Sequence, residues 1–263
     1  MHFIETSAGK FHYLLEGPDG TPAIVLSNSL GTNLAMWDAQ AHAFSHKFRV
    51  LRYDTRGHGL SSDSKGPYSI EQLGRDVLAL LDSLQITRAV FCGISLGGMT
   101  GMWLGIHAAE RLNGLILCNT AGRIGTAEGW NARMAKIRES GMESVAQAVV
   151  GRWFTPRFVA RSPQTVEAAR QMLISTPVEG YAACCAAIRD ADLRPSLAKV
   201  NVPTLVIAGT HDGVTTPADA AFLVKNIRGA LGAEIGAAHL SNIEAPGNFN
   251  KSVLRFLSAR EAR

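Results

Sequence analysis

The chain is poor in cysteine, and it has no apolar run long enough to cross a membrane. Four cysteines occur among 263 residues, two in apolar runs and two adjacent to each other: Cys92, Cys118, Cys184 and Cys185. This distribution suits neither a disulfide framework nor a Cys-x-x-Cys metal site. No apolar run approaches the roughly 18 residues of a transmembrane helix, and the first residues lack the layout of a signal peptide. We therefore expect a reduced, cytoplasmic protein with no membrane partner.

Charged residues are also scarce, and they form no block of one sign. Asp, Glu, Lys and Arg make up 18% of the chain, and the formal net charge is +4. Without a basic block, we expect no nucleic-acid partner. The positive excess is concentrated in residues 122–190, which hold nine Lys or Arg against six Asp or Glu. If this segment covers a pocket, its charge favours an anionic ligand.

Short apolar runs alternate with helical patterns along the chain. Five runs are typical of buried strands: 23–29, 48–54, 89–94, 114–120 and 204–210. Between two of them, residues 69–84 carry an apolar helical face behind Ser69, a suitable N-cap. Such alternation predicts an α/β fold, with a mostly parallel central sheet and helices on both faces. Residues 3–17 are expected to add an antiparallel hairpin at one edge.

The alternation stops after Thr120 and resumes near residue 200. The intervening stretch contains helical periods and no convincing strand. We predict a helical cap over residues 122–190, inserted into a core made by residues 1–121 and 191–263. A chain of this length can hold one α/β domain with such an insertion.

Ser95 lies between glycines, in Gly-Ile-Ser-Leu-Gly, after an apparent strand and before a helix-compatible stretch. This is the context of a nucleophile elbow, a sharp strand-to-helix turn that exposes a serine hydroxyl at the sheet edge. Only small neighbours fit around such a strained turn, which accounts for Gly93 and Gly97. A glycine-rich turn in which Ser95 merely caps the helix is the alternative.

A serine nucleophile needs a base, because its hydroxyl is almost wholly protonated near neutral pH. His239 opens a polar loop after the last probable strand, and Asp212 lies just beyond the run 204–210, separated from it by His211 alone. Both can reach the sheet edge that carries Ser95, and the chain order Ser, Asp, His is one of the known triad orders. Surface-loop and turn-capping roles are the alternatives for His239 and Asp212.

His58 is a competing candidate, since it lies between two glycines after another strand end. A ligand role is conceivable there. We favour instead a tight turn that Asp54 and Arg56 stabilise, with no catalytic role for His58.

An oxyanion hole requires two backbone N–H donors. Leu96, immediately after the serine, is expected to supply one. The second should come from the loop that follows the run 23–29, and we assign it to Leu30.

These motifs resemble the α/β-hydrolase superfamily over nearly the whole chain. They read LSNSLGTNLAMWDAQ, RYDTRGHGLSS, GISLGGMTG, GTHDGVTTP and GAAHLSNIEAPGNFN. Within the superfamily they are most similar to the 3-oxoadipate enol-lactonases of bacterial aromatic catabolism. Most members carry His-Gly in the oxyanion loop, whereas this chain has Asn28-Ser29, as the lactonases do. The resemblance implies a cytoplasmic hydrolase without cofactor or metal.

The resemblance also implies roles for the matching positions. Ser95 would be the nucleophile, Asp212 the acid and His239 the base, with Leu30 and Leu96 as oxyanion donors. The implied substrate is a small anionic lactone, and Arg133 in the basic segment is our first candidate for its carboxylate. Trp153 is a second candidate contact. A solvated helix charge and a buried cap residue are the respective alternatives.

Other activities of the same fold stay open at this point. A carbon–carbon bond hydrolase and a general esterase or perhydrolase share the triad, and a ligand receptor could retain it with little turnover. Members that use Asp as the nucleophile are disfavoured by Ser95. The sequence does not determine the oligomeric state.

Overall fold

The computed structural model describes residues 2–62 and 64–261, which build one eight-stranded sheet in the order β1-β2-β4-β3-β5-β6-β7-β8. The β1–β2 and β2–β4 pairs are antiparallel, and β4, β3 and β5 to β8 run parallel. The strands are β1 His2–Thr6, β2 Gly9–Glu16, β3 Ala23–Ser27, β4 Arg49–Tyr53, β5 Ala89–Ile94, β6 Leu112–Cys118, β7 Thr204–Gly209 and β8 Leu231–Ile235.

The five predicted strands and the N-terminal hairpin are confirmed, with ends that shift by one or two residues. Strands β3, β5 and β7 are buried along their full length, as expected for parallel strands covered on both faces. The sequence patterns do not predict β8. This strand lies at the sheet edge, is largely exposed, and includes Gly232 and Glu234, so it lacks an apolar signature.

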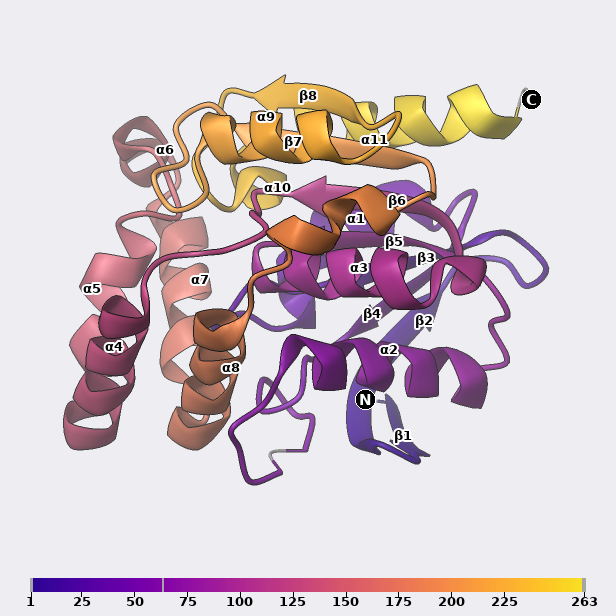
Figure 1. Ribbon diagram of the computed structural model, residues 1–263. Coiled ribbons are helices and arrows are strands. Elements are labelled where there is room, and N and C mark those ends of the chain that lie inside the picture. The colour runs from indigo at the N-terminus through magenta and orange to yellow at the C-terminus, as the bar shows by residue number, and fades with distance from the viewer. Residues whose placement is uncertain (1, 63, 262–263) are drawn as a thin grey trace.

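Helices cover both faces of the sheet (Figure 1). One face carries α2 (Ile70–Ser83), α3 (Leu96–His107) and α9 (Pro217–Asn226), and the other carries α1 (Asp38–Phe44) and α11 (Pro246–Glu261). The Ser69 side chain accepts a hydrogen bond from Gln72 N, which confirms the predicted N-cap of α2. Shorter elements are η1 (Leu34–Trp37), η2 (Ala109–Arg111), η3 (Arg194–Lys199) and α10 (Ser241–Glu244).

Five further helices separate β6 from β7 and gather beyond one end of the sheet (Figure 1). They are α4 (Ala127–Ser140), α5 (Glu143–Val150), α6 (Pro156–Arg161), α7 (Pro163–Ile174) and α8 (Val178–Asp190). Because β6 leads into α4, this group lies beyond the carboxyl ends of the parallel strands. Ligands of open parallel sheets bind at that edge. Over the described ranges, no helix has both the length and the apolar character needed to span a bilayer.

Candidate active site

Ser95 occupies a strained turn between β5 and α3. Its backbone has φ 56° and ψ −112°, a positive φ that a non-glycine residue rarely adopts. The neighbouring glycines are required sterically: a Cβ at Gly93 would lie 2.2 Å from Gly97 O, and one at Gly97 would lie 2.3 Å from Ser27 O. The turn is fixed from β6, since Ser95 N donates to Cys118 O and Thr120 Oγ1 donates to Ser95 O. This is the predicted nucleophile-elbow geometry.

Asp212 and His239 form a buried hydrogen-bonded pair. His239 Nδ1 lies 2.8 Å from Asp212 Oδ2, and both residues are less than 5% exposed. Burial by itself raises the pKa of Asp212, but hydrogen bonds from His239, Asn119 and Val214 outweigh it and lower the pKa to about 2. The carboxylate therefore stays ionised at neutral pH. It holds Nδ1 of His239 as the donor, which leaves Nε2 free to take a proton.

Ser95 and His239 line one small cavity of about 30 Å³. Among the described residues no hydrogen bond joins Ser95 Oγ to His239, a looseness common in hydrolases before substrate binds. The cavity is also lined by residues of the loop after β3 and of the helical segment: Ser29, Leu30, Ile124, Trp130, Arg133, Val149, Arg152, Trp153, Tyr181, Ile188 and Val214. The groups needed for acyl transfer thus meet in one enclosed space.

The N–H groups of Leu30 and Leu96 are available as donors. Neither donates to another group within 2–62 and 64–261. The loop that carries Leu30 is tied down through Asn28, whose Oδ1 accepts from Trp37 Nε1 and whose carbonyl accepts from Gly97 N. Two free donors held on rigid backbone beside a serine can stabilise a developing oxyanion.

Asn119 is a further member of the site. It follows β6 at a positive φ of 43°, and its Nδ2 donates to Asp212 Oδ2 at 2.9 Å and to Ala238 O at 3.2 Å. Its Oδ1 accepts from Ser241 Oγ. Asn119 thereby connects the loop of the acid to the loop of the histidine.

Two arginines of the helical segment face the cavity without a carboxylate partner in the described part of the chain. Arg133 is half-buried, and its guanidinium lies 4.7 Å from the centre of the Trp130 ring. Burial and the positive charge of Arg133 lower the pKa of Arg152. Of the six other arginines of the segment, four are paired with acids: Arg123, Arg138, Arg170 and Arg189. Two like charges at one cavity create a field that favours an anion.

Tyr181 places a buried hydroxyl at the same cavity. The residue is fully buried, and among the described residues its hydroxyl has no hydrogen-bond partner of good geometry, although Arg133 lies close enough to act on its pKa. Burial raises that pKa, so the phenol stays protonated and can donate. Trp153, 3% exposed, closes another wall.

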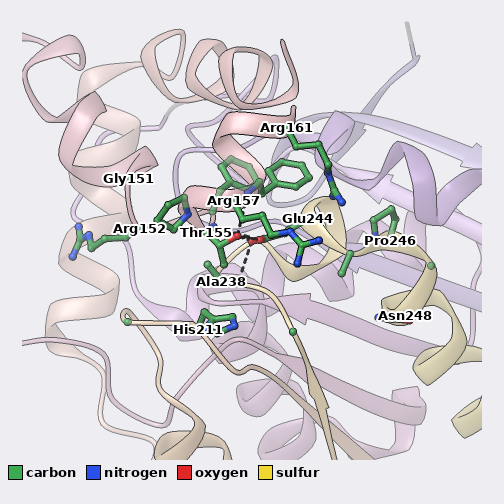
Figure 2. A pocket seen from close by; sticks show the side chains of 17 residues that line it. Gly151, Arg152, Thr155, Arg157, Arg161, His211, Ala238, Glu244, Pro246 and Asn248 are labelled. Atoms are coloured by element: carbon green, nitrogen blue, oxygen red, sulfur yellow. Dashed lines mark hydrogen bonds between the residues drawn. The ribbon is translucent and has the colours of Figure 1, made fainter. Parts of the chain in front are cut away.

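A much larger cavity lies beside this site and not at it. A depression of about 940 Å³ borders His211 and Ala238, the neighbours of Asp212 and His239. Figure 2 shows the guanidinium groups of Arg157 and Arg161 on one side of it and that of Arg152 pointing away on the other. Arg152 lines both this depression and the small cavity. We place the chemistry in the small cavity, because Ser95 lies there.

Comparisons with known proteins identify the fold. A family model described as alpha/beta hydrolase fold matches residues 22–246. The chain belongs to the α/β-hydrolase family. The hydrolase is 49% identical over 256 residues to 3-oxoadipate enol-lactonase 2 of Acinetobacter baylyi, an alignment that covers 96% of each chain. Among solved structures it is similar to an enol-lactonase from Burkholderia xenovorans, with a TM-score of 0.96, 49% identity, and coverage of 98% of this chain and 100% of that one.

A thermophilic esterase from Thermogutta terrifontis is a more distant structural relative. Its TM-score is 0.92 at 26% identity, with coverage of 98% of both chains. The fold and family predicted from the sequence motifs are therefore confirmed.

The fold of this hydrolase brings the predicted site residues close together, with Leu96 directly after Ser95 at the start of α3. Ser95, His239, Leu30, Arg133 and Trp153 all line the small cavity, and Asp212 is bonded to His239 behind it. Sequence reasoning missed three contributors, which are Asn119, Arg152 and Tyr181. A polar residue directly after an apolar run was a usable signal for Asn119, whereas nothing in the alanine-rich stretch around Tyr181 marks it out.

Proposed function

We propose that this α/β-hydrolase is a serine hydrolase that opens 3-oxoadipate enol-lactone to 3-oxoadipate in aromatic catabolism. The observation that carries the mechanism is a strained serine that shares one cavity with a bonded Asp–His pair. The similarity to two enol-lactonases at 49% identity supports the substrate. A cytoplasmic location accompanies the proposal and is favoured by four free cysteines.

Catalysis begins when His239 Nε2 takes the proton of Ser95 Oγ as the oxygen attacks the lactone carbonyl. The N–H groups of Leu30 and Leu96 stabilise the tetrahedral oxyanion. Its collapse breaks the ring C–O bond and expels an enolate, which delocalises the negative charge. The proton held by His239 returns to this fragment, which becomes the 3-oxo group. Water activated by His239 then hydrolyses the acyl-enzyme and frees the second carboxylate.

Arg133, Arg152 and Tyr181 are proposed to bind the carboxylate that the lactone already carries. Both guanidinium groups lack an acidic partner in the described residues, and the Tyr181 phenol is a buried donor. Charge-assisted hydrogen bonds to a carboxylate are stronger than neutral ones, and an arginine can make two in parallel. A carboxylate would also relieve the repulsion between the two arginines.

Residues 122–190 are proposed to act as a cap on a core of residues 1–121 and 191–263. A cavity of about 30 Å³ has room for about one water molecule. Helices of this segment must therefore shift to admit the lactone. Closure then excludes water from the acyl transfer, which strengthens the interactions of the two oxyanion donors.

The test compares turnover of 3-oxoadipate enol-lactone with turnover of p-nitrophenyl acetate by the purified chain. We expect kcat/KM for the enol-lactone to exceed that for the acetate by at least about 100-fold, because two charged hydrogen bonds contribute roughly 1.5–3 kcal/mol each. A simple esterase is the second candidate, favoured by the likeness to the Thermogutta enzyme. Equal rates on both substrates would establish the esterase and refute the lactonase.

A further inference from the structure

His58 lies at the junction of three segments and has no role in the mechanism above. It belongs to the loop after β4 and is 1% exposed. The loop after β3, which carries Leu30, lies alongside because β3 and β4 are adjacent parallel strands. Helix α8 packs from the other side, so closely that a Cβ on Gly57 would lie 2.6 Å from Gly180 Cα.

The ring of His58 accepts a backbone hydrogen bond from the oxyanion loop. Gly31 N donates to His58 Nε2 at 3.0 Å, and His58 Nδ1 lies 3.3 Å from Arg56 O. An acceptor at Nε2 requires the proton on Nδ1, which then donates to the Arg56 carbonyl. The contacts thus select the neutral ring with a single tautomer.

This bond holds the residue immediately after Leu30. In the described loop, Ser29 N donates to Met36 Sδ, Gly31 N to His58, and Thr32 N to Ser29 O, while Leu30 N has no protein acceptor. Gly31 has a φ of +79°, and a Cβ there would lie 2.5 Å from Leu173 Cδ1. The direction of the free N–H is therefore set by bonded neighbours on both sides.

The opposite side of the ring contacts the helical segment. The ring of Tyr181 lies 6.4 Å from that of His58, centre to centre, and Cys184 Sγ lies 4.0 Å from His58 Nδ1. Tyr181 also lines the small cavity. One imidazole thus touches both the oxyanion loop and a cavity wall.

We propose that His58 is a positioning residue, whose Nε2 lone pair fixes the Leu30–Gly31 segment so that Leu30 N–H points at the developing oxyanion. The proposal rests on the function above, since it takes Ser95 as the nucleophile. It assigns His58 no proton transfer. Removal of the acceptor leaves Gly31 N–H buried and unbonded, and the segment turns to find another partner.

The experiment compares His58→Phe, which keeps a ring without an acceptor, with His58→Gln, which restores an acceptor near the Nε2 position. We expect His58→Phe to lower kcat by about 10- to 100-fold with KM changed less than about threefold, since a lost oxyanion donor costs about 100- to 1,000-fold. His58→Gln should recover most of kcat. His107→Phe, at the end of α3 where the ring stacks on Trp103, is the matched control and should keep the wild-type kcat.

A trifluoromethyl ketone supplies a second readout, because its serine adduct bears an oxyanion. In His58→Phe, the inhibition constant of the ketone should rise by about the factor by which kcat falls. The affinity of this variant for 3-oxoadipate should stay constant. All variants are also assayed with p-nitrophenyl acetate, whose hydrolysis needs the same oxyanion hole. Failure of the enol-lactone assignment would therefore leave the His58 comparison readable.

A further test uses the wild-type protein and therefore does not require that any variant folds. Nitrogen-15 NMR of the imidazole should show Nδ1 protonated and Nε2 bare, coupled to the Gly31 amide. A ring protonated at Nε2 would overturn the proposal. So would equal losses in His58→Phe and His58→Gln, or an unchanged kcat in His58→Phe.

Discussion

Two regions of the hydrolase contribute to the site in different ways. At the carboxyl ends of the strands, the polar groups are bonded to one another, and Asp212 alone accepts five hydrogen bonds. In the helical segment between β6 and β7, Arg133 and Arg152 reach the cavity with no acidic partner in the described chain. The strand-end groups are thus fixed by mutual hydrogen bonds, and we propose that the two arginines of the helices are unpaired because they bind an anionic ligand.

This contrast separates the rate of the reaction from the choice of substrate. Groups fixed before substrate arrives need no reorganisation in the transition state. In the proposed function, arginines without an acidic partner complete their hydrogen bonds only when an anion is present. Changes at the strand ends should therefore alter kcat on every ester, whereas changes in the helices should alter KM on anionic substrates.

The largest effect is expected at Ser95. Ser95→Ala should lower kcat by about 10⁴- to 10⁶-fold, as loss of a triad nucleophile does. Titration calorimetry should still detect 3-oxoadipate with near wild-type affinity, because the arginines are untouched. Ser252→Ala removes a hydroxyl that donates to Asn248 O within α11, away from the site, and should keep full activity. A Ser95→Ala enzyme that retained most of its kcat would break the assignment of chemistry to the strand ends.

The strand-end groups could be predicted from the sequence because position there follows from chain order. Ser95 directly follows the buried strand β5, and Asp212 lies three residues after the end of the buried strand β7. Parallel strands bring such positions to one edge. Asn119 likewise directly follows a buried strand, β6, but it does not belong to a familiar sequence motif. The position of His58 after a strand end makes it a candidate from the sequence, but its bond to Gly31 appears only when two loops 27 residues apart are brought together.

The next largest effect is expected in the stability of the protein towards acid. A buried histidine at a strand end should change the free energy of unfolding with pH much more than an exposed ion pair of the helices does. Burial lowers the pKa of His58 to about 4, against the raising effects of Arg56 O and Asp54; Tyr181 and Cys184 of α8 also face the ring. The unfolded chain, with a pKa near 6.5, takes up the proton first. Stability contributed by neutral His58 is therefore complete above about pH 6.5 and decreases by about 3 kcal/mol as the pH falls to about 4.

Urea unfolding at pH 7, 5.5 and 4 measures this effect. His58→Gln should flatten the pH dependence over that window. Glu179→Gln, which removes an exposed and solvent-screened partner of Arg138, should alter it only slightly and only near pH 4, where Glu179 begins to take up a proton in the unfolded chain. Below about pH 3.8 the protonation of Asp212 should cost further stability, because its folded pKa of about 2 is lower than its unfolded value. An unaltered slope in His58→Gln would show that other groups carry the acid sensitivity.

The helical segment was harder to predict. Its nine basic residues indicate an anion, but helical periodicity does not tell which of them face inward. Arg133 lies four residues before Ile137 on α4 and reaches the cavity, whereas Arg138 pairs with Glu179 at the surface. That choice depends on how α4 packs against α8, a tertiary arrangement that local pattern does not encode.

Substitution of the two cavity arginines tests whether the helical segment determines substrate binding and not the rate of the reaction. Arg133→Ala and Arg152→Ala should each raise KM for the enol-lactone by about 10- to 100-fold, because a hydrogen bond to a charged group contributes roughly 1.5–3 kcal/mol. KM for p-nitrophenyl acetate should change less than about threefold, since that ester has no carboxylate. Arg138→Ala, which removes an exposed ion pair, is the matched control and should affect neither substrate. Equal losses on both substrates would mean that the arginines support the fold and not the ligand.

The smallest effect on kcat is expected at Thr215, which is bonded to Asp212 at the strand ends. Thr215 Oγ1 donates to Asp212 Oδ2 at 2.9 Å, one of the five bonds to that carboxylate. Thr215→Val removes this bond at nearly constant shape, so kcat should fall about fivefold, equivalent to about 1 kcal/mol, on both substrates alike. Thr215→Ser should restore it. Thr216→Val alters the next residue, whose hydroxyl caps α9 through Asp219; it should lower the unfolding free energy by about 1 kcal/mol and spare kcat. A Thr215→Val loss confined to the anionic lactone would instead tie this bond to substrate binding, and the separation of rate from recognition would fail.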